Sequence, residues 1–161
     1  MGHSFPAQLR ELYLRHDGEG DQLVPGTFLS LKFLSLQESL EVIQEFQENR
    51  AFVIVTEEEL DPRLSAGYPH PGHLPVFSDT TGNYLGVDVD PGPLGKAGQV
   101  VLFGADFDDV QVVFDDLAAC LLWAAELLSS ERVTLKPDGR WPDVVVAGPR
   151  VHAVEALLDT V

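Results

Sequence analysis

Hydrophobic residues that recur every three or four positions predict a first helix over residues 7–16. Leu9, Leu12 and Tyr13 lie at i, i+3 and i+4, which puts all three on one face of a helix. Pro6 suits the first helical turn, because proline has no backbone N–H to leave unbonded there. We therefore expect a short amphipathic helix near the start of the chain.

A second helix is predicted to begin at Ser35, where Ser35-Leu36-Gln37-Glu38 forms a capping box. In this motif the serine hydroxyl accepts a hydrogen bond from a free backbone N–H, and the glutamate reaches back to the backbone of the cap. The positions that follow predict one buried face, made of Leu36, Leu40, Ile43 and Gln47 and widened by Val42 and Phe46. The opposite face carries four carboxylates, Glu38, Glu41, Glu45 and Glu48.

A third helix is predicted after Asp115-Asp116, whose carboxylates suit the free N–H groups of a helix start. Its apolar residues follow at helical spacing and predict a buried face of Leu117, Cys120, Leu121, Ala124 and Leu128. A last helix is predicted over residues 150–158.

Short apolar runs between turn signals predict the strands. Residues 83–90 alternate, with Leu85, Val87 and Val89 on one side, and this period of two predicts a half-buried strand. The other predicted strands cover residues 27–33, 51–55, 74–77, 99–103, 110–114, 132–135 and 144–147.

This order of elements predicts the fold class. Helices come first, several short strands follow, and a helix comes after them, which favours an α+β fold over an alternating parallel-sheet fold. We expect a mainly antiparallel sheet with helices packed on one face. The length of 161 residues favours a single domain.

The charge balance narrows the choice of partner. Ten Lys and Arg face 26 Asp and Glu, for a net charge of −16. Such a field repels phosphates and anionic lipid headgroups, so nucleic acids and membrane surfaces are disfavoured. A basic protein is favoured, because opposite potentials speed encounter, although acidity also serves solubility alone.

The cysteine count and the N-terminus predict a cytoplasmic protein. The single cysteine, Cys120, cannot form an internal disulfide, which fits a reducing compartment. The first residues show no basic segment followed by an apolar run, as a secretory signal would.

The sequence offers little chemistry. Cys120 lies on the apolar side of its helix and is expected to pack in the core. The segment Gly92–Gly98 resembles a phosphate loop only superficially, because Asp90 stands where the motif needs glycine and Ala97 where it needs a hydroxyl. We therefore predict no catalytic residue and no cofactor.

Two histidines and two aspartates leave an alternative open. His70 and His73 are predicted to be an exposed loop pair, and Asp88 and Asp90 lie on one side of a strand. Together they define a rival hypothesis, an enzyme or metal site, since zinc and hard cations use such ligands. The sequence supplies no further ligand, so we predict no metal.

The central segment resembles a known family. Residues 74–91, Leu-Pro-Val-Phe-Ser-Asp-Thr-Thr-Gly-Asn-Tyr-Leu-Gly-Val-Asp-Val-Asp-Pro, are followed by Gly95 and by Gly98-Gln99-Val100-Val101. These two segments, in this order and followed by a strand and a helix, resemble the SUKH superfamily, the Smi/Knr-like group. The resemblance covers about residues 5–130. On this basis we divide the chain into a SUKH-like domain over residues 1–130 and a C-terminal extension over residues 131–161, packed on the same domain.

The resemblance implies an antiparallel sheet with flanking helices and a protein-binding role. Bacterial members are associated with immunity against polymorphic toxins, and fungal members act as signalling scaffolds. Our main hypothesis is a bacterial immunity protein that neutralises a basic toxin domain, for example a nuclease. The alternative is a regulatory or scaffold protein that binds a cytosolic partner.

Residues near one sheet edge are predicted to bind the partner. Acidic side chains there would cover a basic face, and an aromatic side chain would anchor it. The predicted partner-binding residues are Tyr84, Asp88, Asp90, Asp106, Phe107, Asp108 and Asp109. Asp79, Asn83, Asp88 and Gln99 also suit hydrogen bonds to loop backbones, so a purely structural role stays open for these four residues.

Overall fold

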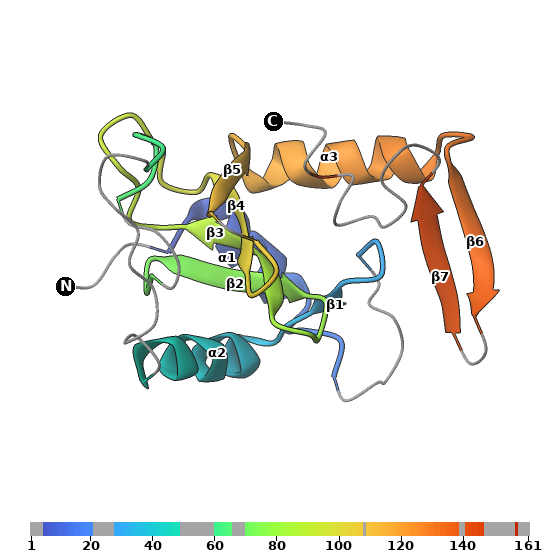
Figure 1. The fold of residues 1–161 in the computed structure, drawn as a ribbon, viewed down its shortest axis with the longest axis horizontal. Coiled ribbons are helices and arrows are strands. Elements are labelled where there is room, and N and C mark those ends of the chain that lie inside the picture. Colours follow the sequence, from blue (N-terminus) through green and yellow to red (C-terminus); the bar gives the residue numbers. More distant parts are fainter. Residues whose placement is uncertain are drawn as a thin grey trace.

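The computed structural model describes residues 5–20, 28–48, 60–65, 70–107, 109–138, 141–146 and 157. Three helices are described (Figure 1): α1 (Ala7–Arg15), α2 (Leu36–Glu48) and α3 (Leu117–Leu128). Within the same residues lie the strands β1 (Lys32–Phe33), β2 (His73–Ser78), β3 (Asn83–Asp88), β4 (Val100–Gly104), β5 (Gln111–Phe114), β6 (Val133–Asp138) and β7 (Trp141–Val146).

Strands β1 to β5 form one sheet in chain order, and each pairs antiparallel with its neighbour. Strands β6 and β7 form a separate hairpin. The α+β class and the antiparallel sheet predicted from the sequence are therefore confirmed. In the described part of the chain, no helix combines the length and the apolar character needed to cross a membrane.

The helices cover both faces of the sheet, so the expectation that they pack on one face was wrong. Along β4, Val100 and Leu102 pack in the cluster that includes residues of α1 and α3. Phe103 points to the other face and packs with Phe46 of α2. Figure 1 shows α2 and α3 on opposite sides of the strands. This arrangement is needed because β4 is buried along its whole length.

Strand β3 is likewise buried more fully than its alternating sequence predicts. Leu85 and Val87 face the core beneath α1 and α3, as expected. On the other side, Gly86 and Asp88 are also buried. This side is covered because Leu64 and Phe46 pack over the same face of the sheet. The half-buried prediction therefore failed for a tertiary reason, namely that a second layer lies over the polar side of the strand.

The predicted strand over residues 27–33 is shortened to β1. Leu29 and Ser30 have φ values of 53° and 68°, in the left-handed region, and Phe28 and Leu31 pair across this turn. Extended pairing therefore starts only at Lys32. Because β1 reaches no farther than Phe77 and Ser78 of its neighbour, it leaves the first half of β2 without a strand on that side.

The capping box of α2 is confirmed, but the predicted buried face is confirmed only for Ile43 and Phe46. The Ser35 hydroxyl accepts from the Glu38 N–H at 3.2 Å, and the Ser35 N–H donates to the Glu38 carboxylate at 2.7 Å. The buried residues of α2 are Ser39, Ile43 and Phe46. Leu36 and Leu40, predicted to be core, are 39% and 54% exposed.

The N-cap of α3 follows the prediction. The Asp116 carboxylate accepts from the Ala119 N–H at 2.9 Å, and this bond is the main reason that the pKa of Asp116 lies below its usual value. Cys120 is fully buried, and burial raises the pKa of its thiol to about 12, which confirms a packed core residue. The predicted face is rotated, since Leu127 is buried while Leu121 and Leu128 are exposed.

The C-terminal part is described only in pieces. The strands predicted over residues 132–135 and 144–147 correspond to the hairpin β6–β7, and Val133 packs beside Leu29 and Leu127. Leu157 is helical and buried in the main core. The predicted strand over residues 51–55 and the rest of the predicted helix over residues 150–158 lie outside the described residues. The domain division at residue 130 stays a prediction.

Candidate partner-binding surface

Asn83 ties together the two turns at one end of the sheet. Its side-chain amide donates to Asp79 at 2.6 Å and to Asp106 at 2.7 Å, and its carbonyl accepts from the Asp106 N–H at 3.0 Å. Burial raises the pKa of Asp79, but hydrogen bonds from Asn83 and Thr81 outweigh burial and hold that pKa below its usual value. A side chain at Gly104 would collide with the Asn83 backbone. The Asp-x-x-Gly-Asn segment, residues 79–83, therefore has a structural role, which is to hold these two turns together.

We expect Asn83→Ala to destabilise the fold by about 2 to 3 kcal/mol, because it leaves two carboxylates side by side without their shared donor. Asn83 itself is only 5% exposed. Urea unfolding followed by circular dichroism measures the change. Thr80→Ala is the matched control within the same turn, since the Thr80 hydroxyl makes no hydrogen bond among the described contacts. Equal stability of the two variants would contradict the role given to Asn83.

Asp88 and Gln99 form a buried network at the opposite end of β3. The Asp88 carboxylate accepts from the Gln99 amide at 2.9 Å and from the Asp90 N–H at 2.9 Å. The Gln99 amide also donates to the Arg63 carbonyl at 2.9 Å, which joins the loop before β4 to residues 60–65. Burial raises the pKa of Asp88. Because Asp88 is fully buried, it cannot belong to a surface, contrary to its place among the predicted partner-binding residues.

His73 lies directly across from Asp88 on β2, which corrects the prediction of an exposed loop histidine. It is fully buried, and neither ring nitrogen has a hydrogen-bond partner among the described residues. Its Nε2 is 4.0 Å from the Asp88 carboxylate. Burial, together with the neighbouring His70, lowers the pKa of His73 to about 3. The ring is therefore neutral at ordinary pH.

The structure does bring together the four residues of the metal hypothesis. His70 Nε2 is 3.9 Å from Asp90, and the rings of His70 and His73 are 5.2 Å apart. However, His70 Nδ1 accepts from the Gly72 N–H at 3.1 Å, so the proton of the neutral ring is on Nε2. Across the described residues, no three or more His, Cys, Asp or Glu side chains are arranged to hold a metal ion.

The remaining predicted partner-binding residues do not form one patch. Asp106 and Asp109 are exposed in the turn between β4 and β5, while Asp90 follows the opposite end of β3. Tyr84 is half-buried and its ring stacks on Phe103 at 5.6 Å. Phe107 is partly buried against the main core, and Asp108 lies outside the described residues. Partner binding by the exposed members stays a prediction.

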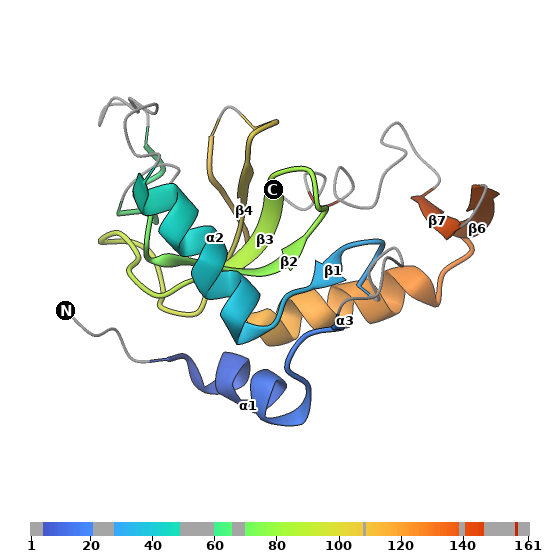
Figure 2. The same cartoon turned by 90° about the horizontal axis from the view of Figure 1, so that it is seen from below.

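An apolar groove between α1 and α2 was missed from the sequence. We call it the α1–α2 groove. Figure 2 shows α2 in front of the sheet and α1 below it at the lower edge of the view. The groove opens where β1 ends, over the first half of β2, and has a cavity volume of about 60 Å³. It is lined by Phe5, Leu9, Tyr13, Leu36, Ser39, Leu40, Ile43, Leu74, Pro75 and Val76.

Hydrogen bonds hold the floor of the groove in place. The Ser39 hydroxyl donates to the Pro75 carbonyl at 2.7 Å, and the Tyr13 hydroxyl donates to the Leu34 carbonyl at 3.1 Å. Burial is the main cause of the raised pKa of Tyr13. The two helices are thus fixed to the sheet, and the groove is preformed, with Leu36 and Leu40 on its open side.

One sequence signal points to this groove. At 3.6 residues per turn, the apolar residues of α2 from Val42 to Leu40 span an arc of about 160°, wider than the roughly 100° stripe that one packing interface needs. The sheet uses the Phe46 side of this arc. The Leu40 side of this arc is not needed for packing on the sheet and is left to line the groove.

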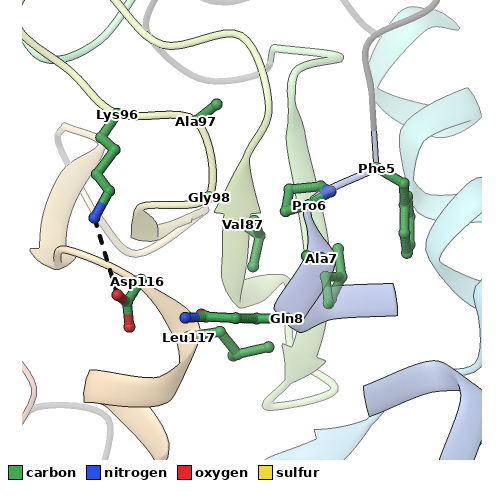
Figure 3. Close-up of a pocket in the computed structure, with 11 residues that line it drawn as sticks. Phe5, Pro6, Ala7, Gln8, Val87, Lys96, Ala97, Gly98, Asp116 and Leu117 are labelled. Atoms are coloured by element: carbon green, nitrogen blue, oxygen red, sulfur yellow. Dashed lines mark ion pairs between the residues drawn. The ribbon is translucent and has the colours of Figure 1, made fainter. Parts of the chain in front are cut away.

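A second hollow adjoins the groove, since Phe5 and Leu9 line both. It has a volume of about 280 Å³ and lies where the start of α1 meets the loop before β4 and the start of α3. Figure 3 shows Lys96 and Asp116 on one side, with 4.0 Å between their charged atoms, and Phe5 on the other. The floor is apolar, with Val87 and Leu117. Together the two hollows form a continuous surface around Phe5.

Residues 1–123 match the model of a protein family, the SMI1 / KNR4 family (SUKH-1). The chain is similar to the "Glucan synthesis regulatory protein" of Neurospora crassa, with 45% identity over 75 residues, which cover 47% of this chain and 14% of that protein. It is also similar to the "Cell wall assembly regulator SMI1" of Saccharomyces cerevisiae, with 44% identity over 71 residues, 44% of this chain and 14% of that protein.

A third relative is the "Cell wall biosynthesis/cell cycle regulator smi1" of Schizosaccharomyces pombe, with 35% identity over 83 residues, 52% of this chain and 16% of that protein. The matched stretch therefore spans less than a fifth of the length of these relatives. All three are fungal proteins named as regulators. These names favour the regulatory alternative and give no support to a bacterial toxin-immunity role or to a basic toxin as partner.

Proposed function

Because the chain belongs to the SMI1 / KNR4 family (SUKH-1), we propose that it is a regulatory module that acts by binding another protein and catalyses no reaction. The relatives described above are named as regulators, not as enzymes. Asp88, one of the residues that suggested chemistry, is engaged in hydrogen bonds that hold loops together, as are Asp79 and Asn83 of the central motif. The protein is further proposed to act in the cytoplasm, in keeping with its single buried thiol.

The α1–α2 groove is the observation that carries this proposal. Monomeric proteins bury most large apolar side chains, and a preformed apolar hollow beside exposed leucines is typical of a binding site. Here Phe5, Leu36 and Leu40 are 41%, 39% and 54% exposed around one hollow. A regulator that works by contact needs such a surface.

Site-specific cross-linking tests the proposal. A photoreactive phenylalanine analogue at Leu40, inside the groove, is expected to cross-link in the native cytosol to a component of a signalling or biosynthetic assembly. The same analogue at Leu94, 72% exposed and outside the groove, is the matched control and should not capture that protein.

Two outcomes would overturn the proposal. Capture of a small toxin domain at position 40 would replace the regulatory role by immunity, the main hypothesis from the sequence. Equal cross-linking at positions 40 and 94, or cross-linking to no protein, would remove the proposed regulatory function of the groove.

A further inference from the structure

We infer that the α1–α2 groove receives a cationic amphipathic helix of the partner, whose apolar side chains enter the groove and whose Lys and Arg side chains lie over α2. This inference rests on the proposed function, because it specifies the partner of the same surface. Three features of the groove support it: its shape, the hydrogen bonding of the backbone at its floor, and the charges on its two walls.

The shape suits a helix. The walls are two helices, and α2 is 13 residues long, which corresponds to about 20 Å. Leu36, Leu40 and Ile43 follow at i, i+4 and i+7 along the wall. This row is parallel to the helix axis and matches the i, i+3/i+4, i+7 anchors of a helix lying in a groove.

The backbone of β2 at the floor of the groove is not suited to pair with an added strand. An extended peptide would need free backbone groups on the part of β2 that β1 leaves uncovered. There Pro75 has no N–H, and its carbonyl accepts from the Ser39 hydroxyl. The Val76 carbonyl accepts from the Leu34 N–H at 2.9 Å. The partner must therefore be recognised through its side chains, which a helix presents without needing backbone partners.

The charges on α1 and α2 determine how the partner helix is oriented in the groove. Beside its leucines, α2 carries Glu41, Glu45 and Glu48 exposed to solvent. Its fourth carboxylate, Glu38, is paired with Lys32 at 2.5 Å. The other wall, α1, is mixed and exposes Arg10, Glu11 and Arg15. Positive side chains of the partner are thus attracted to the α2 side, and the net charge of −16 speeds their approach.

Selection from a peptide library tests the inference directly. The probe is a display library of helix-forming peptides of about 16 residues, roughly four turns. It is selected on the full chain and counter-selected on Leu40→Asp. The expected winners combine apolar residues at i, i+3/i+4 and i+7 with an excess of Lys and Arg on one flank.

Binding of one winning peptide is then measured by fluorescence anisotropy. Leu40→Asp should weaken it about 30-fold or more, the effect of losing a central anchor. The triple variant Glu41→Gln, Glu45→Gln, Glu48→Gln should weaken it severalfold and flatten its salt dependence. The matched controls are Leu122→Asp, a 65% exposed leucine of α3, and Glu126→Gln on the same helix, and both should bind as the unchanged protein does.

Other outcomes overturn the inference. Winners that are acidic, uncharged or rich in proline, or that bind Leu40→Asp equally well, would show that the groove does not take a cationic helix. Cross-linking at position 40 without such winners would remove this inference and leave the proposed function standing. Cationic helical winners without any cross-linked protein would support the groove chemistry and remove the proposed function.

Discussion

Phe103→Ala is expected to destabilise the fold by about 3 to 5 kcal/mol, the usual effect of emptying a large aromatic site in a core. Phe103 has no solvent exposure. Its ring lies 5.6 Å from Tyr84, 5.7 Å from His73 and 6.1 Å from Phe46. The side chain therefore joins α2 to the sheet, and its removal leaves a cavity at that contact.

Urea unfolding measured by circular dichroism checks this value. Leu94→Ala, at a side chain 72% exposed, is the control and should change the free energy of unfolding by less than about 0.5 kcal/mol. If Phe103→Ala costs less than about 1 kcal/mol, the packing of α2 on this face is not as described. Because Phe46 of α2 also lines this cluster, the same variant should weaken binding at the α1–α2 groove.

The second large effect is an acid sensitivity that comes from His73. Its pKa is about 3 in the folded chain against a usual value of 6.5. Below pH 6.5 the unfolded chain binds a proton that the folded chain does not, so stability falls as the pH falls. The loss is on the order of 2 kcal/mol at pH 5 and about 4 kcal/mol near pH 3.

Asp88 acts in the opposite direction. Burial raises its pKa above the usual 3.8, so its contribution to stability is present at low pH and is lost as the pH rises through its folded pKa. This contribution offsets part of the His73 effect at the acid end. The contribution of His73 is isolated by comparing the pH dependence of the free energy of unfolding between the unchanged protein and a variant without the imidazole.

His73→Leu is that variant. At pH 7 it should leave the free energy of unfolding unchanged or slightly higher, because it removes two buried nitrogens that have no partner in the part of the chain that the structure describes. Between pH 6.5 and pH 5 it should lose about 2 kcal/mol less than the unchanged protein. Urea unfolding at several pH values measures both slopes. Parallel slopes would mean that His73 is not buried as a neutral ring.

Much of the local structure was predictable because it depends on neighbours in sequence. The capping box at Ser35 and the N-cap at Asp116 involve residues three apart, and both form as expected. The three described helices and most of the strands follow from periodicity for the same reason. The central motif also indicated the family correctly. Its Asp79 and Asn83 meet within one turn.

The candidate site was predictable only in part. The acidic residues Asp88 and Asp90 are close in sequence, yet one is fully buried and the other is not. Leu40 was assigned to the core, yet it lines an open groove. In both cases the outcome depends on which distant segment covers a side chain, and a one-dimensional pattern does not contain that information.

By itself, the sequence determined the α+β class, the antiparallel strands, the helix caps and the strong negative charge, because each depends on residue type and short-range spacing. Only the tertiary structure decided that helices cover both faces of the sheet, that His73 and Asp88 are sealed inside, and that α1 and α2 leave a groove between them. The physical reason is that burial is set by long-range packing: β1 ends early, α2 turns its Phe46 side to the sheet, and Leu36 and Leu40 are left facing solvent.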